Sequence, residues 1–113
     1  MIKIYHNNRC SKSRSALKLL EESGKAFEVI NYLEDVPSKE ELNHIIKLLK
    51  ITPIELIRKN ETIWKENFKN QELSEEGLID VMIKYPKLIE RPIIINGNKV
   101  VIGRPPEHIL DII

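Results

Sequence analysis

The chain has 113 residues, of which 42% are hydrophobic and 31% are charged, and its formal net charge is +1. This size and composition suit one soluble domain with one core, and the balanced charge gives no general attraction to nucleic acid or anionic membranes. The apolar runs are far too short for a membrane span, and the first residues lack the pattern of a secretory signal. We therefore expect a cytoplasmic protein that binds neither membranes nor nucleic acid.

The first third of the chain predicts a strand, a helix and a second strand. Residues 1–5 are a short apolar strand candidate, and residues 11–23 have a helical pattern that Gly24 stops. Residues 26–32 alternate apolar and polar side chains, with β-branched residues among them, which is typical of a strand. At this spacing the elements form a βαβ unit, in which we expect parallel strands and a right-handed crossover.

The middle of the chain has only helical patterns. Ser38 and Glu41 form a capping box in front of an amphipathic helix. The segment Thr52-Pro53-Ile54-Glu55 forms a second capping box, and its short helix should run to about Lys59. The apolar stripe of the first of these helices consists of Leu42, Ile45, Ile46 and Leu49.

Two further helix candidates complete this helical block. Residues 60–70 can form a short polar helix that turns Trp64 and Phe68 inward, four positions apart. Ser74 caps the last helix of the block, and Pro86 ends it. The predicted buried stripe of that last helix consists of Leu78, Val81, Met82 and Tyr85.

The C-terminal part predicts a hairpin followed by a helix. Residues 92–95 and 99–102 read as strands joined by the turn Asn96-Gly97-Asn98. A terminal helix should start near Pro106. We expect its apolar side to carry Ile109, Leu110 and Ile113.

The element order βαβ, helices, ββα is that of an α/β protein with a thioredoxin-like fold. This fold would have a four-stranded mixed sheet, with an all-helical insertion at about 38–90 in a single domain over residues 1–113. A cis proline precedes the third strand in this fold and faces the N-terminal cysteine, and Pro92 occupies that place. We therefore expect the Arg91–Pro92 bond to be cis.

Cys10, the only cysteine, lies where the first strand turns into the first helix. The free N–H groups of a helix N-terminus favour a thiolate, and so do the nearby Arg9, Lys12 and Arg14. Such surroundings can lower a thiol pKa from about 8.5 to about 3.5–7.5. The alternative is a small buried apolar cysteine, the usual state of a lone one. Because one cysteine cannot form an internal disulfide, a redox cycle would need an external thiol.

Arginine is rare in this lysine-rich chain, which has 13 Lys but only five Arg. Guanidinium groups bind oxyanions through two parallel hydrogen bonds, which ammonium groups cannot do, so an arginine kept in such a chain points to a special role. The alternative is chance placement. Outside the segment around the cysteine, the arginines are Arg58, Arg91 and Arg104.

Five segments of the chain carry a recognisable pattern: Ile4-Tyr5-His6-Asn7 with Cys10 and Ser13-Arg14, Tyr32-Leu33-Glu34 with Pro37-Ser38, Ile57-Arg58-Lys59-Asn60, Glu90-Arg91-Pro92-Ile93, and Arg104-Pro105. Together they resemble the glutaredoxin-dependent arsenate reductase family. The segments keep the family's order and nearly its spacing, so the resemblance covers essentially the whole chain. It implies a cytoplasmic oxidoreductase that reduces arsenate to arsenite.

The resemblance also implies a role for each matching residue. Cys10 matches the nucleophile that attacks arsenic. The arginines that cradle the oxyanion are matched by Arg58, Arg91 and Arg104. The supporting residues are His6, Ser13 and Pro92. Glutathione would be the co-substrate and glutaredoxin the partner, and we expect a monomer with no bound cofactor.

The chain departs from the reductase pattern around its cysteine. Asn8 stands where the family usually has proline, Arg9 replaces a small residue, and Ser11-Lys12 replaces Gly-Thr. The basic pair Arg9 and Lys12 resembles a shorter branch of the same family.

Other functions fit the residues less well. A cysteine phosphatase needs an arginine six positions after its nucleophile, where this chain has Ala16. Spx-type transcriptional regulators share the fold and bind RNA polymerase, but their Cys-x-x-Cys switch cannot form here because Ser13 stands at the position of the second cysteine. The same residue argues against a two-cysteine thioredoxin or glutaredoxin. A non-catalytic regulator or binding protein and a monothiol glutaredoxin-like protein remain as alternatives. His44 and His108 lack metal-ligand spacing, so we expect no metal site.

Overall fold

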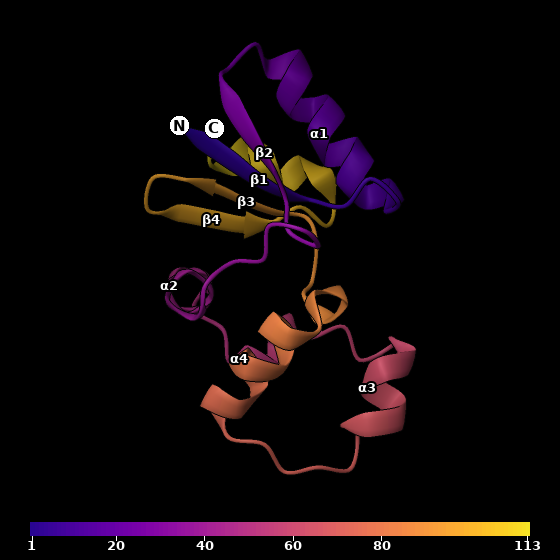
Figure 1. The fold of residues 1–113 in the computed structure, drawn as a ribbon. Helices are drawn as coiled ribbons and strands as arrows, with labels where there is room; N and C mark the ends of the chain where they lie inside the picture. Colours follow the sequence, from indigo (N-terminus) through magenta and orange to yellow (C-terminus); the bar gives the residue numbers. More distant parts are fainter. The chain divides into compact units, whose positions relative to one another are not determined.

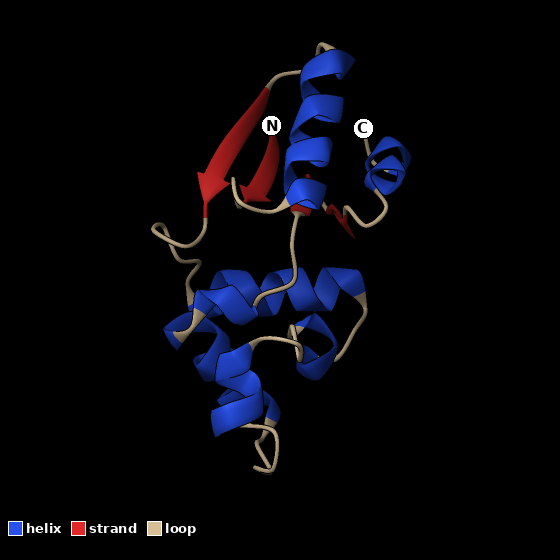
Figure 2. Cartoon of the chain, turned by 90° about the vertical axis from the view of Figure 1, so that its right-hand side faces the viewer, coloured by secondary structure: helices blue, strands red, loops and turns tan.

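The computed structural model describes residues 1–113, which form two compact units (Figure 1). One unit, here called the sheet unit, consists of Met1–Asp35 and Arg91–Ile113. The other, here called the helical unit, is Val36–Glu90. In Figure 2 the strands all lie in the sheet unit, which also contains helices, whereas the helical unit contains helices and loops but no strands. The single domain expected from the sequence stays a prediction.

The sheet unit is built on four strands in the order β2-β1-β3-β4. β1 (Ile2–His6) pairs in parallel with β2 (Phe27–Asn31) and antiparallel with β3 (Ile93–Asn96). β4 (Lys99–Ile102) pairs antiparallel with β3 and forms the far edge. The predicted four-stranded mixed sheet and the order of the thioredoxin-like fold are therefore confirmed, and each predicted strand lies within one residue of its expected start and end.

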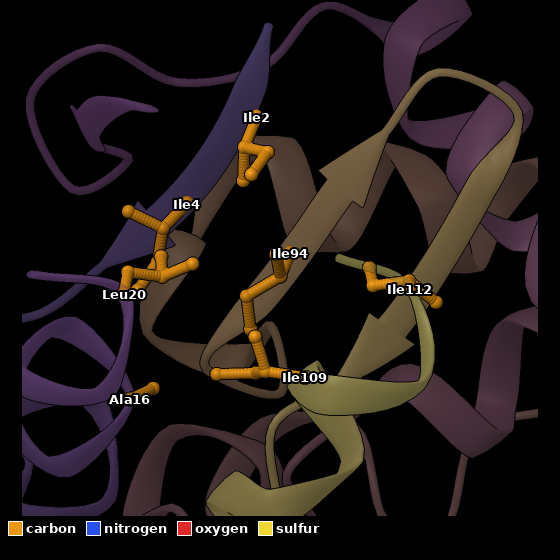
Figure 3. Packing of buried hydrophobic residues seen from close by; sticks show 7 residues of the cluster. All are labelled: Ile2, Ile4, Ala16, Leu20, Ile94, Ile109 and Ile112. Carbon is orange, nitrogen blue, oxygen red and sulfur yellow. The ribbon is translucent and has the colours of Figure 1, made fainter. Parts of the chain in front are cut away.

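One face of the sheet is covered by α1 (Ser11–Ser23) and by the short 3-10 helix η3 (Pro106–Asp111). Alternate strand residues point to one face, which puts Ile2 and Ile4 of β1 and Ile94 of β3 on the same side as the apolar stripe of α1. Figure 3 shows the resulting core, which consists of Ile2, Ile4, Ala16, Leu20, Ile94, Ile109 and Ile112.

The C-terminal helix differs from its prediction. It is a 3-10 helix, in which residues three apart share a face, so that Ile109 and Ile112 are buried. Leu110, which the α-helical pattern placed on the apolar side, is 60% exposed, and that part of the prediction is wrong. Ile113 is partly buried against the same core.

The helical unit contains α2 (Lys39–Leu49), α3 (Thr62–Asn67) and α4 (Glu75–Lys84), with the 3-10 helices η1 (Pro53–Leu56) and η2 (Pro86–Leu88). Ser38 caps α2 by accepting the Glu41 N–H, and Ser74 caps α4 by accepting the Gly77 N–H, because each hydroxyl satisfies an N–H that has no partner within its helix. No helix in the structure is both long and apolar enough to cross a bilayer.

Two details of the helical unit correct the sequence predictions. The helix after Thr52 ends at Leu56 instead of continuing to about Lys59, because Ile57 bridges to Ile89 in an antiparallel pair whose flanking hydrogen bonds take the backbone groups a longer helix would need. The buried residues of α4 are Leu78, Ile79 and Met82, whereas the predicted Val81 and Tyr85 are only half-buried.

Candidate active site

Cys10 lies in the turn that joins β1 to α1. Its N–H donates to the Asn7 carbonyl at 3.0 Å, and its own carbonyl accepts the Arg14 N–H at 3.0 Å, which begins the helix. Cys10 is therefore the N-cap residue of α1, with extended backbone angles. The residue is only 8% exposed. This position aims its side chain at the free N–H groups of the first helical turn.

The surroundings of Cys10 favour its charged form. Burial raises the pKa of the thiol, but hydrogen bonds from the Ser13 N–H, the Arg91 side chain and the Lys12 N–H, together with the charge of Arg91, hold the pKa below its ordinary value. These are the donors that a helix N-terminus and a nearby cation are expected to supply. The predicted thiolate therefore has a specific physical basis, and the alternative of an inert apolar cysteine is disfavoured.

Two arginines of the sheet unit converge on Cys10 from the other end of the chain. Arg104 donates from Nη2 to the Cys10 sulfur at 3.5 Å and from Nε to the Arg91 carbonyl at 2.7 Å. Burial lowers the pKa of Arg91, but its hydrogen bond to Cys10 and the neighbouring Tyr32 hold that pKa above its ordinary value. Arg91 therefore stays charged beside the sulfur.

The segments that carry these arginines are joined by a backbone hydrogen bond between Gly103 and Pro92. The Arg91–Pro92 bond is cis, as predicted, and the Arg104–Pro105 bond is cis as well, which the sequence reasoning did not predict. The Gly103 N–H donates to the Pro92 carbonyl at 2.9 Å. Gly103 is needed there because an added Cβ would lie 2.9 Å from Cγ of Pro92.

The side chains of His6 and Ser13 make their hydrogen bonds to each other and to the turn residues Asn7 and Asn8, not to the Cys10 sulfur. The Ser13 hydroxyl is 2.6 Å from Nδ1 of His6 and accepts the Asn7 N–H at 3.0 Å, while Nε2 of His6 is 2.6 Å from Oδ1 of Asn8. Ser13 serves the thiolate through its backbone N–H. The hydroxyl that the resemblance places near the sulfur is thus committed to His6.

Arg58, the third predicted oxyanion ligand, belongs to the helical unit. Nη1 of Arg58 donates to Glu90 at 2.9 Å and Nε donates to Glu61 at 3.4 Å, while the Arg58 N–H donates to the Leu88 carbonyl at 2.7 Å. Its side chain is 20% exposed. Two carboxylates and the bridge next to Ile57 therefore fix its position within that unit.

The sequence reasoning missed Tyr32 and Asn8 as part of this site. Tyr32 follows β2, is 1% exposed, and contributes to the electrostatics of Arg91. Tyr32 belongs to one of the segments that resemble the reductases, and this resemblance could have identified it as a site residue. Asn8 departs from the family pattern in the sequence, and its contact with His6 follows from the folded turn.

Comparison with known proteins shows the family of this chain. Residues 5–112 match the ArsC family. The chain belongs to the ArsC family. The family predicted from the five sequence segments is thus confirmed.

Several ArsC-family relatives match along nearly their whole length. The Escherichia coli protein named "Uncharacterized protein YfgD" is 47% identical over 99% of this chain and 96% of its own. A Neisseria meningitidis protein named arsenate reductase is 42% identical over 96% of this chain and 94% of its own. A solved structure of arsenate reductase from Vibrio cholerae is 44% identical, covers 99% of this chain and 97% of its own, and superposes with a TM-score of 0.93.

Proposed function

We propose that this chain reduces arsenate to arsenite, with Cys10 as the nucleophile. The observation that carries the proposal is the Cys10 thiol, whose pKa is lowered and whose sulfur receives a hydrogen bond from Arg104, in an ArsC-family chain. Relatives named arsenate reductase, 42% identical over nearly the full length, support the choice of substrate.

The arginines are proposed to bind the substrate. Arsenate is a tetrahedral oxyanion, and planar guanidinium groups pair with such oxygens through two hydrogen bonds at once. Arg91 and Arg104 already lie at the sulfur, so an anion held by them would place its arsenic atom next to Cys10. Arg58 is the proposed third ligand. The same cations would neutralise charge that develops on the oxygens during attack.

The proposed chemistry has three steps. The Cys10 thiolate forms a sulfur–arsenic bond, and one arsenate hydroxyl takes up a proton and leaves as water. A glutathione thiolate then attacks the Cys10 sulfur; the electron pair of the sulfur–arsenic bond stays on arsenic, which is reduced from As(V) to As(III) and leaves as arsenite. A glutaredoxin thiolate then attacks the glutathione sulfur of the resulting disulfide, forms a glutaredoxin–glutathione disulfide and releases Cys10 as the thiolate.

The rest of the proposal concerns the setting of this reaction. The single cysteine makes an external thiol necessary, so glutathione is proposed as co-substrate and glutaredoxin as partner. Both are available where thiols are kept reduced, so the cytoplasm is proposed as the site of the reaction. The chain is proposed to act as a monomer without a bound cofactor.

The test is a coupled assay that contains arsenate, glutathione, glutaredoxin, glutathione reductase and NADPH. NADPH oxidation that depends on arsenate is expected with the wild type and should fall to background with Cys10→Ser, which removes the nucleophile while adding no bulk. Circular dichroism of both proteins checks that the fold is kept. Turnover by Cys10→Ser would refute the nucleophile assignment, and absence of turnover by a folded wild type would refute arsenate reduction.

A further inference from the structure

The turn between β1 and α1 contains a hydrogen-bonded chain that the proposed chemistry does not use. His6 is 3% exposed and Ser13 is fully buried, so their polar atoms need partners within the protein. Both ring nitrogens of His6 have one: Nδ1 lies 2.6 Å from the Ser13 hydroxyl, and Nε2 lies 2.6 Å from Oδ1 of Asn8. The Asn7 N–H donates to the Ser13 hydroxyl oxygen at 3.0 Å.

For a neutral His6 ring, the chemistry of Asn8 fixes the direction of every bond in this chain. An amide oxygen can only accept, so the hydrogen between Asn8 and His6 must be on Nε2. A neutral imidazole has one N–H, which leaves Nδ1 as an acceptor. The Ser13 hydroxyl then donates to Nδ1, and its oxygen remains free to accept the Asn7 N–H. Each donor in the chain is matched to one acceptor.

We propose that Asn8 is a positioning residue, which holds His6 in the Nε2–H tautomer and thereby directs the Ser13 hydroxyl to His6 and away from Cys10. With its side chain held between His6 and Asn7, Ser13 presents its backbone N–H to the sulfur. The thiolate is then stabilised by backbone N–H groups and by guanidinium groups, without a hydroxyl donor. The inference rests on Cys10 being the nucleophile of the proposed function.

The opposite tautomer would change the site. If Nδ1 carried the hydrogen, the Ser13 oxygen would accept from both His6 and Asn7, and the Ser13 hydroxyl hydrogen would be released from His6. Asn8 excludes this arrangement as long as its oxygen faces the ring. Asn8 itself is an exposed residue, so it can be replaced without disturbing the core.

The tautomer can be measured directly by NMR of the ¹⁵N-labelled protein, through long-range couplings between the ring protons and nitrogens. The exposed His44 and His108 are assigned with His44→Gln and His108→Gln and serve as internal references. We expect the Nε2–H tautomer for His6 in the wild type and in Asn8→Asp, since carboxylate oxygens also only accept. Asn8→Ala should give a mixture of tautomers. An Nδ1–H ring in the wild type, or a changed tautomer in Asn8→Asp, would overturn the proposal.

The link to Cys10 is tested by the rate at which iodoacetamide alkylates the thiol across a pH series. At the high-pH end of the series, where the thiol is fully ionised, Asn8→Ala should slow alkylation by about threefold, because a released Ser13 hydroxyl donates one hydrogen bond to the sulfur and lowers its nucleophilicity. In a Ser13→Ala background the same substitution should have no further effect, because the path from Asn8 to the sulfur is already broken.

Two results of the alkylation series would overturn the positioning role: an unchanged rate in Asn8→Ala, or an equal effect with and without the Ser13 hydroxyl. His6→Gln provides a second background in case Ser13→Ala does not fold. Neither the NMR nor the alkylation measurement contains arsenate. Failure of this inference is therefore distinguishable from failure of the proposed reaction, which the coupled assay measures.

Discussion

Arg104 and Cys10 are 94 residues apart in the sequence, yet Nη2 of Arg104 lies 3.5 Å from the Cys10 sulfur. The same guanidinium donates from Nε to the Arg91 carbonyl at 2.7 Å. Arg104 therefore joins the N-terminal turn to the segment that precedes β3, and it does so with two nitrogens of one planar group. A lysine has the same charge but only one nitrogen, so it cannot make both contacts.

The first prediction follows from the two hydrogen bonds that the Arg104 guanidinium donates. Arg104→Lys should lower kcat/KM for arsenate by roughly tenfold or more, since a hydrogen bond to a charged group contributes about 1.5–3 kcal/mol. Arg9→Lys is the matched control, because Arg9 is an exposed arginine next to Cys10 and the change keeps its charge. The coupled assay measures both variants. Equal activities would show that charge alone is sufficient at position 104.

The second prediction concerns the dependence of stability on pH. The pKa of Cys10 is lowered in the folded chain, so between the folded value and the unfolded value of about 8.5 the unfolded state binds more protons. The free energy of unfolding of the wild type, relative to Cys10→Ser, should therefore rise with pH across this interval. The contribution is complete above the unfolded value and is lost as the pH falls through the folded one.

Urea unfolding of the two proteins, in the presence of a reducing agent, measures this difference at a series of pH values. A difference that stays constant, or one that shrinks as the pH rises, would contradict the lowered pKa. The comparison with Cys10→Ser cancels the titration of the other groups, because the two chains differ at one atom only.

The third prediction tests the close contact between Gly103 and Pro92. In Gly103→Ala the new methyl group would lie 2.9 Å from Cγ of Pro92 and 3.1 Å from Cδ1 of Ile94, so these rigid, buried neighbours must move. Such overpacking costs about 1–3 kcal/mol. We expect a lower urea midpoint, together with slower alkylation of Cys10, since Arg104 is the next residue.

Gly97→Ala is the control for this substitution. Gly97 has φ of 63° and open space around it, so an alanine there destabilises the hairpin through its backbone angle alone. It should lower the urea midpoint while leaving alkylation of Cys10 unchanged. Loss of stability without any change at the thiol in both variants would contradict the coupling between Gly103 and the site.

The fourth prediction separates the two roles of Arg58. Arg58→Lys keeps a cation between Glu61 and Glu90, so the urea midpoint should change little. If Arg58 also binds arsenate, the loss of its planar fork should raise the KM for arsenate several-fold, as expected for one lost hydrogen bond to an anion. Lys65→Arg, an exposed change in the same unit, is the control. An unchanged KM would assign Arg58 a structural role only.

Local patterns predicted much of the sheet unit. The helix after Cys10 begins and ends at the expected residues, because a strand, a turn and a stop at Gly24 are all signalled within a short stretch. The hairpin around Gly97 was equally readable. The family segments then identified Cys10, Arg91 and Arg104 as residues to bring together, and the folded chain does so.

The remaining features depend on contacts that a local pattern does not contain. The exposure of Leu110 follows from the tighter winding of η3, which was not signalled by its apolar residues. The early end of η1 follows from a bridge between Ile57 and Ile89, more than thirty positions away. The bond from Asn8 to His6 depends on how the turn folds back on the strand.

The single thiol also limits how many reducing electrons the protein can hold. Conversion of arsenate to arsenite takes two electrons, and a chain with a second cysteine could release both at once by closing an internal disulfide and be recharged later. Cys10 has no such partner. Under the proposed function the protein therefore stores no reducing electrons between turnovers. The rate of every cycle then depends on the ratio of reduced to oxidised thiols around the protein.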